Sequence, residues 1–283
     1  MLVQRMWLAL SLVLLATVAG CGSSDDDGPP NADPGAATAK YASVNGMQMY
    51  YEERGQGAPL VVLNGGLCTI ASCVGPLLPT WAKTRRVIAV EQQGHGHTND
   101  IDRPLTYDHM AEDVVVLLER LGIAKADFFG YSDGGIVALR LGIRHPNLIR
   151  RMVTLSAYHD SRGLEPGLIE QMEQLTPEAV PPSMKEDYAK VAPDPSKWPV
   201  LVEKVKRLGI DFQGFPDAEV RTIPVPVLIV MGDHDIMTTQ YGEELSRLLP
   251  NAQLVVLPGA DHFSIATHAE TILSKSTAFL DAP

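Results

Sequence analysis

The amino-acid sequence predicts an α/β fold, a doubly wound and mostly parallel sheet with a helical insertion that forms a lid. Three observations indicate this. Short apolar runs typical of buried strands alternate with stretches whose apolar residues recur at helical spacing. One of these runs leads through a glycine-flanked serine directly into a helical pattern. A long, proline-divided stretch late in the chain interrupts the alternation and predicts the insertion.

The first twenty residues predict a signal peptide. One positive charge, at Arg5, precedes an apolar run over residues 6–18, which is shorter than the roughly 20 residues that span a bilayer. The run leads into Val18-Ala19-Gly20-Cys21, which resembles the lipobox of bacterial lipoproteins. That resemblance implies lipidation of Cys21 and an exported protein anchored to a bacterial membrane, facing the periplasm or the cell surface. The alternative is an ordinary secretory signal.

Residues 21–40 predict a flexible tether, because they are small, acidic and rich in proline and glycine. The folded domain is expected over residues 41–283, beginning at Tyr41, and its length is normal for one α/β domain. The formal net charge of the chain is -11. An acidic surface disfavours nucleic acid as a partner, since nucleic acids bind basic surfaces.

The elements of the domain follow in order. Asn45-Gly46, flanked by alternating residues over 42–51, predicts a β-hairpin. Buried strands are expected at residues 60–63, 87–90, 126–129, 152–155, 225–231 and 254–257, and helices at 110–121 and 135–141.

The lid is expected over about residues 158–222. Three helix-like stretches lie here, at 164–175, 184–191 and 200–208, and prolines separate them. An insertion after the carboxyl end of a strand lies where open α/β sheets bind ligands. Its aromatic residues predict an apolar pocket; they are Tyr188, Trp198, Phe212 and Phe215. The alternative is a structural decoration away from the site.

Gly130-Tyr131-Ser132-Asp133-Gly134 reads G-x-S-x-G between a predicted strand and a predicted helix. This is the context of a nucleophile elbow, in which a strained backbone lifts the serine hydroxyl clear of the sheet. A serine hydroxyl needs a base, and the base needs an orienting acid. Asp235 follows the second-last strand and His262 the last, which gives the order that such a site requires. The alternative for the motif alone is an ordinary Gly/Ser turn.

Further motifs identify a family resemblance that covers residues 41–280. Glu91–Thr98 is similar to the D-x-x-G-H-G-x-S motif of the α/β-hydrolase superfamily, and Leu63–Gly66 to its apolar-H-G-x oxyanion loop. Gly232-x-x-Asp235 resembles its acid turn. The hairpin and the elbow resemble the branch that contains valacyclovir hydrolase and related carboxylesterases. Two positions depart from the family pattern, because Asn64 replaces a histidine and Glu91 an aspartate.

The resemblance implies an α/β-hydrolase fold and a serine hydrolase that cleaves carboxylic esters through an acyl-enzyme intermediate. Ser132 would be the nucleophile, His262 the base and Asp235 the acid, while the backbone N–H groups of Gly66 and Asp133 would form the oxyanion hole. A small-molecule ester is the expected substrate, with neither a cofactor nor a metal.

Alternatives on the same fold are a lactonase, an aminoacyl peptidase or thioesterase, a carbon–carbon bond hydrolase, and a cofactor-free haloperoxidase or perhydrolase. A non-catalytic surface-binding lipoprotein is the alternative from another class. The Asp133 side chain has two interpretations, a charge that favours the helix N-terminus or one that selects cationic substrates.

Cys68 and Cys73 are the two cysteines that remain beside Cys21. An even number in an exported protein predicts a disulfide. Residues five apart in a regular helix exceed the ~7 Å Cα separation that a disulfide allows, so the bond requires a compact loop. Two reduced, buried cysteines are the alternative.

Replacing Cys21 tests the anchor. Cys21→Ser should give unprocessed or soluble protein, because the lipid that holds the chain at the membrane is no longer attached. The measurement is fractionation of cells with immunodetection. Unchanged processing and membrane binding would contradict lipidation.

Overall fold

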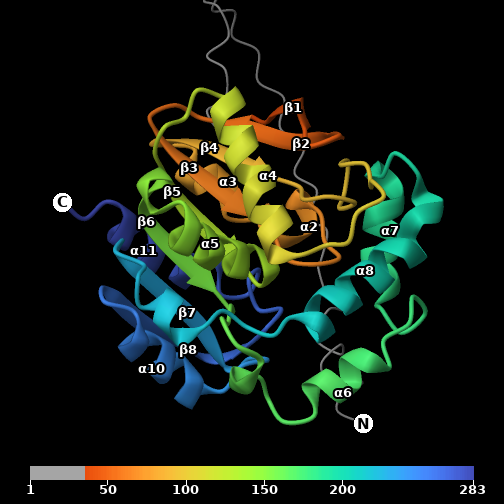
Figure 1. Cartoon of the computed structure of the whole chain (residues 1–283). Coiled ribbons are helices and arrows are strands. Elements are labelled where there is room, and N and C mark those ends of the chain that lie inside the picture. Colours follow the sequence, from red (N-terminus) through yellow and green to blue (C-terminus); the bar gives the residue numbers. More distant parts are fainter. Residues whose placement is uncertain (1–35) are drawn as a thin grey trace, which may run out of the picture. The chain divides into compact units, whose positions relative to one another are not determined.

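The computed structural model describes residues 36–283 (Figure 1). The predicted signal peptide, Cys21 and most of the predicted tether lie outside the described residues. The first strand, β1 (Thr38–Val44), begins three residues before the predicted start at Tyr41. It extends this far because Thr38–Lys40 pair with Tyr51–Glu53 of the next strand, and Lys40 Nζ lies 2.9 Å from Glu53 Oε2.

One sheet of eight strands, in the order β1-β2-β4-β3-β5-β6-β7-β8, forms the centre of residues 36–283. β1 and β2 are antiparallel to their neighbours, and β4, β3 and β5–β8 run parallel. The remaining strands are β2 (Met47–Arg54), β3 (Ala58–Leu63), β4 (Arg85–Val90), β5 (Ala126–Tyr131), β6 (Ile149–Leu155), β7 (Val227–His234) and β8 (Ala252–Asp261). The predicted fold class and each predicted strand are therefore confirmed.

The β1–β2 hairpin turns at Asn45 and Gly46, whose φ angles are +44° and +91°. Positive φ at both central residues matches the right-handed twist of the strands, and asparagine and glycine adopt it most readily. Asn45 Nδ2 also donates to Asp113 Oδ1 over 2.8 Å, which fastens the turn to a helix.

Helices cover both faces of the sheet, as alternation along the strands requires. Val61 and Leu63 of β3 join the core under α4 (Tyr107–Arg120), α5 (Asp133–Arg144) and α10 (Thr239–Leu248). Leu60 and Val62 point to the opposite core, with α3 (Leu78–Trp81) and α11 (Ala269–Leu280). The parallel strands therefore lie between two layers of helices. The loop that follows β3 at its carboxyl end meets the insertion, because Gly66 lies against Val205.

The predicted insertion separates β6 from β7 and contains α6 (Leu168–Glu173), α7 (Pro182–Val191), α8 (Trp198–Asp211) and α9 (Asp217–Val220). Figure 1 shows α7 and α8 beside each other. α6 is shorter than the predicted helix over 164–175. Leu164 instead forms an isolated β-bridge with Met237, and Gly167, at φ +83°, precedes the first helical residue.

The lid is fastened to the core domain through α8. Lys204 Nζ donates to Asp100 Oδ1 (2.7 Å) and Oδ2 (2.8 Å) and to the carbonyl oxygens of Ile101 (2.8 Å) and Arg103 (2.9 Å). A half-buried ammonium group with these acceptors fixes the middle of α8 against the 100–103 loop. No helix within residues 36–283 is long and apolar enough to cross a membrane.

Candidate active site

Ser132 lies in the turn between β5 and α5 with φ +53° and ψ -122°. This conformation is costly for any residue with a side chain, and two sets of contacts hold it. The Ser132 N–H donates to the Leu155 carbonyl over 2.8 Å, and the Ser132 carbonyl accepts from Gly135 N–H over 2.8 Å as α5 begins. A Cβ on Gly134 would lie 2.3 Å from the Leu63 carbonyl oxygen, so only glycine lets the helix pass this close.

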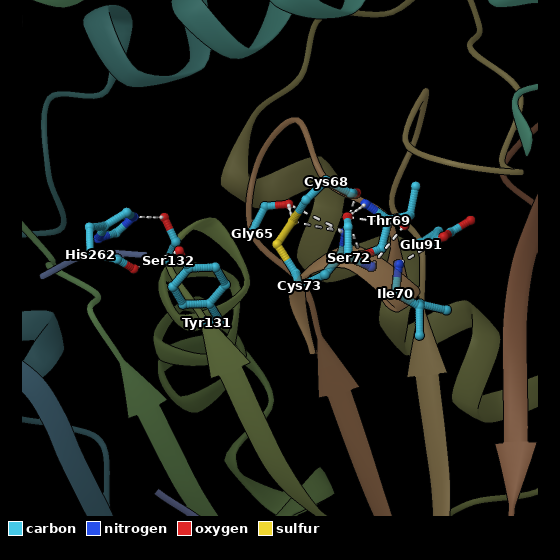
Figure 2. Close-up of a disulfide and its surroundings, with 11 residues drawn as sticks. Gly65, Cys68, Thr69, Ile70, Ser72, Cys73, Glu91, Tyr131, Ser132 and His262 are labelled. Atoms are coloured by element: carbon cyan, nitrogen blue, oxygen red, sulfur yellow. Dashed lines mark hydrogen bonds between the residues drawn. A yellow bond between two sulfur atoms is a disulfide. The ribbon is translucent and has the colours of Figure 1, made fainter. Parts of the chain in front are cut away.

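His262 connects Ser132 to Asp235. His262 Nε2 lies 3.0 Å from Ser132 Oγ, and Nδ1 lies 2.8 Å from Asp235 Oδ1. With a carboxylate at Nδ1, this nitrogen carries the proton and Nε2 is free to accept one from the serine hydroxyl. Figure 2 shows the His262 imidazole directed at Ser132, and the Tyr131 ring below Ser132. The Tyr131 hydroxyl donates to the His262 carbonyl over 2.8 Å and so holds the histidine loop.

Asp235 is buried, and each of its carboxylate oxygens accepts further hydrogen bonds. Oδ1 accepts from Ile236 N–H over 2.7 Å, and Oδ2 accepts from Gly232 N–H over 3.1 Å and from the Ser156 hydroxyl. Burial opposes ionisation, but the hydrogen bonds from His262, Ser156 and Gly232 outweigh it and keep the pKa of Asp235 below its usual range. The carboxylate is therefore charged and fixed where it faces the imidazole.

Ser156 was not identified from the sequence. It follows β6 directly, has φ +55° and directs its hydroxyl at Asp235. The sequence could have indicated it, because Ser156 follows the carboxyl end of β6, the strand that pairs with β5. Asp233, near the end of β7, is exposed, and its Oδ1 accepts from Gly259 N–H over 2.8 Å, whereas His262 Nδ1 bonds to Asp235.

The predicted oxyanion loop follows β3 and lies against the elbow. A Cβ on Gly65 would lie 3.2 Å from Ser132 Cβ. A Cβ on Gly66 would lie 2.4 Å from Asp133 Oδ2 and 3.0 Å from Val205 of α8. Gly66 is therefore enclosed between the elbow and the lid, and the structure brings both predicted oxyanion residues to the same place.

Asn64, where the family pattern has histidine, supports this loop. It is buried, and its Nδ2 donates to the Cys68 carbonyl over 2.7 Å and to the Gly65 carbonyl over 3.3 Å. An amide side chain thus spans the turn from Gly65 to Cys68 with two hydrogen bonds. The substitution preserves a buttress for the loop.

A disulfide joins Cys68 and Cys73, whose Cα atoms are 6.0 Å apart. Cys68 lies in the turn after Gly66, and Cys73 ends the one-turn helix α2 (Ile70–Cys73). Figure 2 shows the bond beside Gly65, and Cys68 Sγ lies 3.3 Å from the Gly65 carbonyl oxygen. The bond closes the segment that carries the oxyanion loop.

Glu91 binds this segment between the two cysteines, a role that the sequence did not indicate. The buried Oε1 accepts from Ile70 N–H over 3.0 Å, at the start of α2. Oε2 accepts from the backbone N–H of His97 over 2.6 Å and lies 2.9 Å from its Nδ1. The carboxylate therefore connects the disulfide segment to the 91–98 loop, and His97 stacks on Tyr50 at a centroid distance of 3.9 Å.

The Asp133 carboxylate lies between Tyr107 and Gly66. The Tyr107 hydroxyl donates to Asp133 Oδ1 over 2.7 Å. Burial raises the pKa of Asp133 above its usual range, although the bond from Tyr107 and the charges of His95 and His262 act in the opposite direction.

Within residues 36–283, no group of three His, Cys, Asp or Glu side chains is placed to hold a metal.

The doubly wound sheet and the elbow at its centre define the class of this protein as a hydrolase. A model of the alpha/beta hydrolase family matches residues 60–274. The chain belongs to that family.

Among curated relatives, the chain is 27% identical over 271 residues to a 2-hydroxymuconate semialdehyde hydrolase of Pseudomonas putida, covering 83% of this chain and 91% of that one. It is 28% identical over 254 residues to the human serine hydrolase BPHL, covering 82% and 84%. Among solved structures, carboxylesterase CesB of Bacillus subtilis superposes with a TM-score of 0.70 at 23% identity, covering 87% and 92%.

Exchanging the two acidic residues near β7 tests the identity of the acid. Asp235→Asn should lower kcat/KM by about 10⁴-fold, because the amide no longer orients the imidazole or stabilises its charge. Asp233→Asn, the matched control, should stay within about threefold, since its exposed carboxylate accepts a hydrogen bond from Gly259 N–H and not from His262. Steady-state ester hydrolysis measures both, and a larger loss in the Asp233 variant would reverse the assignment.

Removing the disulfide tests whether it positions the oxyanion loop. The double variant Cys68→Ala/Cys73→Ala should lower kcat by about tenfold, part of the 10²–10³ that one oxyanion donor contributes. It should lower the free energy of unfolding by only about 2 kcal/mol, because the closed loop is short. Ester hydrolysis and thermal unfolding measure the two effects. Two free thiols in the unreduced, denatured protein, or a kcat unaffected by reduction, would contradict this role.

Proposed function

We propose that this protein is a serine hydrolase that cleaves carboxylic esters. The observation that supports it most is the continuous hydrogen-bonded chain from Ser132 Oγ through His262 to the Asp235 carboxylate, beside the Gly65-Gly66 loop. A surface-binding lipoprotein has no need of a strained serine backbone, a histidine and a buried carboxylate in this arrangement. The lipobox resemblance supports the further proposal that Cys21 attaches this enzyme to a membrane.

The reaction would proceed in two acyl transfers. Ser132 Oγ attacks the ester carbonyl carbon while its proton passes to His262 Nε2. The carbonyl oxygen, now negative, accepts from the Gly66 and Asp133 N–H groups. The carbon–oxygen bond to the alcohol then breaks, and His262 gives its proton to the leaving oxygen. Water attacks the acyl-enzyme with the same assistance, which releases the acid and restores Ser132.

Relatives with other printed activities keep alternatives open. A semialdehyde hydrolase, a serine hydrolase and a carboxylesterase share this fold, and an enol-lactonase of Burkholderia xenovorans LB400 superposes with a TM-score of 0.69. A lactonase, thioesterase, aminoacyl peptidase or carbon–carbon hydrolase would use the same three residues. A panel of simple esters, lactones and thioesters assayed on one preparation distinguishes these chemistries.

The nucleophile assignment is tested by removing one oxygen atom. Ser132→Ala should lower hydrolysis of p-nitrophenyl acetate by at least ~10³-fold, because no hydroxyl remains to attack. Ser43→Ala, on the exposed face of the hairpin, is the matched control and should keep full activity. Circular dichroism establishes that both variants are folded. Near-native turnover in the Ser132 variant would reject the proposed function.

Within this function, the Asp133 carboxylate favours aminoacyl esters. Its carboxylate lies next to Gly66, and its ionisation is opposed by burial, so an ammonium group on the acyl α-carbon would stabilise the charge. Asp133→Asn keeps the backbone N–H. It should lower kcat/KM for aminoacyl esters about ten- to a hundredfold and leave desamino esters within about threefold. Paired benzyl esters measure this, and equal losses for both would contradict selection by charge.

The same substitution has a pH-dependent effect on stability. A carboxyl whose pKa is raised by folding stabilises the protein at low pH and loses that contribution as pH rises through the folded pKa. Asp133→Asn should therefore be more stable than the wild type at pH 7. The difference should vanish below about pH 3.9, where the carboxyl is protonated in both folded and unfolded chains. Denaturant unfolding at the two pH values measures it.

A further inference from the structure

A cavity of about 620 Å³ lies between the first turn of α4, the second half of α8 and the segment 212–219. This volume is in the range of pockets that hold small organic ligands. None of its lining residues belongs to the Ser132–His262–Asp235 chain. Its apolar lining includes Leu105, Tyr107, Leu208, Phe212 and Phe215.

The two arginines that line this cavity are paired with acidic side chains of the same lining. Arg140 Nη1 lies 3.0 Å from Glu219, and its Nη2 pairs with Asp108. Arg140 also lies over the Phe215 ring, 5.0 Å from its centroid. Arg207 Nε lies 3.2 Å from Glu203 on the same helix. Because these arginines already have carboxylate partners, the cavity favours an uncharged, apolar occupant over an anion.

One layer of side chains separates the cavity from the elbow. Tyr107 lines the cavity and donates its hydroxyl to Asp133, the residue after Ser132. Phe212 lines the cavity and meets the Tyr107 ring edge to face at a centroid distance of 4.7 Å. Phe212 directly follows α8 in extended backbone, and Gly214, at φ +82°, comes two residues later. Tyr107, with Phe212 packed on its ring, therefore forms the contact between the cavity and the elbow.

The direction of the cavity distinguishes the two halves of an ester. The leaving alcohol must lie at His262 Nε2, from which it receives its proton. The carbonyl oxygen must lie at Gly66 and Asp133. The acyl substituent takes the remaining direction. Tyr107 of the cavity wall contacts Asp133, and no residue of the 261–268 loop that carries His262 lines the cavity.

We propose that the cavity between α4 and α8 binds the apolar acyl chain of the substrate, with Tyr107 and Phe212 as its entrance. This inference rests on the proposed ester hydrolysis and adds the substrate class, esters of medium-length acids. The bonds of Lys204 to Asp100 and its neighbours hold the α8 wall in place, so the cavity is formed before the chain enters. An α-ammonium group at Asp133 is compatible with such a chain beyond it.

The experiment compares p-nitrophenyl esters that differ only in the length of the acyl chain, from acetate to decanoate. Each methylene buried in the cavity should raise kcat/KM by up to about fourfold, so octanoate should exceed acetate by at least about tenfold. Leu208→Trp fills the cavity from its wall, and Gln213→Trp narrows it from its exposed mouth. Each should lower the octanoate-to-acetate ratio by about tenfold. Phe212→Ala, which removes half of the entrance, should raise it.

Val200→Trp adds the same indole to an exposed position of α8 that does not line the cavity, and its ratio should equal that of the wild type. Acetate is too short to fill the cavity, so its hydrolysis by wild type tests the proposed function separately. An octanoate-to-acetate ratio that is unchanged in folded Leu208→Trp and Gln213→Trp, with acetate still hydrolysed, would overturn the cavity assignment alone.

A crystal structure of the protein with Ser132 modified by an octyl phosphonate should show the alkyl chain between α4 and α8. An alkyl chain along the 261–268 loop would also overturn the cavity assignment.

Discussion

The site depends on the backbone of one residue. Ser132 keeps a left-handed conformation because its N–H is bound to Leu155 on the neighbouring strand and its carbonyl begins α5. This conformation directs Oγ at His262 and leaves the Asp133 N–H at the start of the helix, where the proposed mechanism requires an oxyanion donor. Each other part of the site is placed relative to that turn. The strain is local, and the central strands and the glycine contacts around the turn sustain it.

The oxyanion loop is held from three sides by contacts of different kinds. Asn64 spans its turn with an amide, the Cys68–Cys73 bond closes the following segment, and Glu91 binds the start of α2. Since a misplacement of about 1 Å in catalytic geometry lowers rates strongly, we expect these supports to affect the rate of the proposed reaction more than the stability of the fold. The two departures from the family motif, at Asn64 and Glu91, both lie in this support, and each makes hydrogen bonds suited to its own side chain.

The sequence predicted what depends on local chemistry. Asn45-Gly46 required a hairpin because both residues tolerate positive φ, and the strand–serine–helix order required an elbow. It did not predict what depends on contacts between distant segments. Ser156 reaches Asp235 across 79 positions of sequence, and Tyr107 reaches Asp133 across 26. α6 begins later than helical spacing indicated, because Leu164 pairs with Met237 instead.

The lid and the core domain meet beside Ser132. Val205 of α8 lies against Gly66, and Phe212 at the end of α8 lies against Tyr107. The same helix thus contacts the oxyanion loop and one wall of the cavity. Changes along α8 are therefore expected to alter substrate preference without altering the chemistry at Ser132.

Mass spectrometry of the protein after reaction with a fluorophosphonate tests whether Ser132 is an activated nucleophile. This reagent forms a stable phosphonyl bond only with a serine that a neighbouring base activates. We expect one adduct per chain, located by peptide mapping on Ser132, with loss of esterase activity in proportion to labelling and greatly slowed labelling in His262→Ala. Absence of an adduct on the folded protein, or an adduct on a different serine, would contradict it.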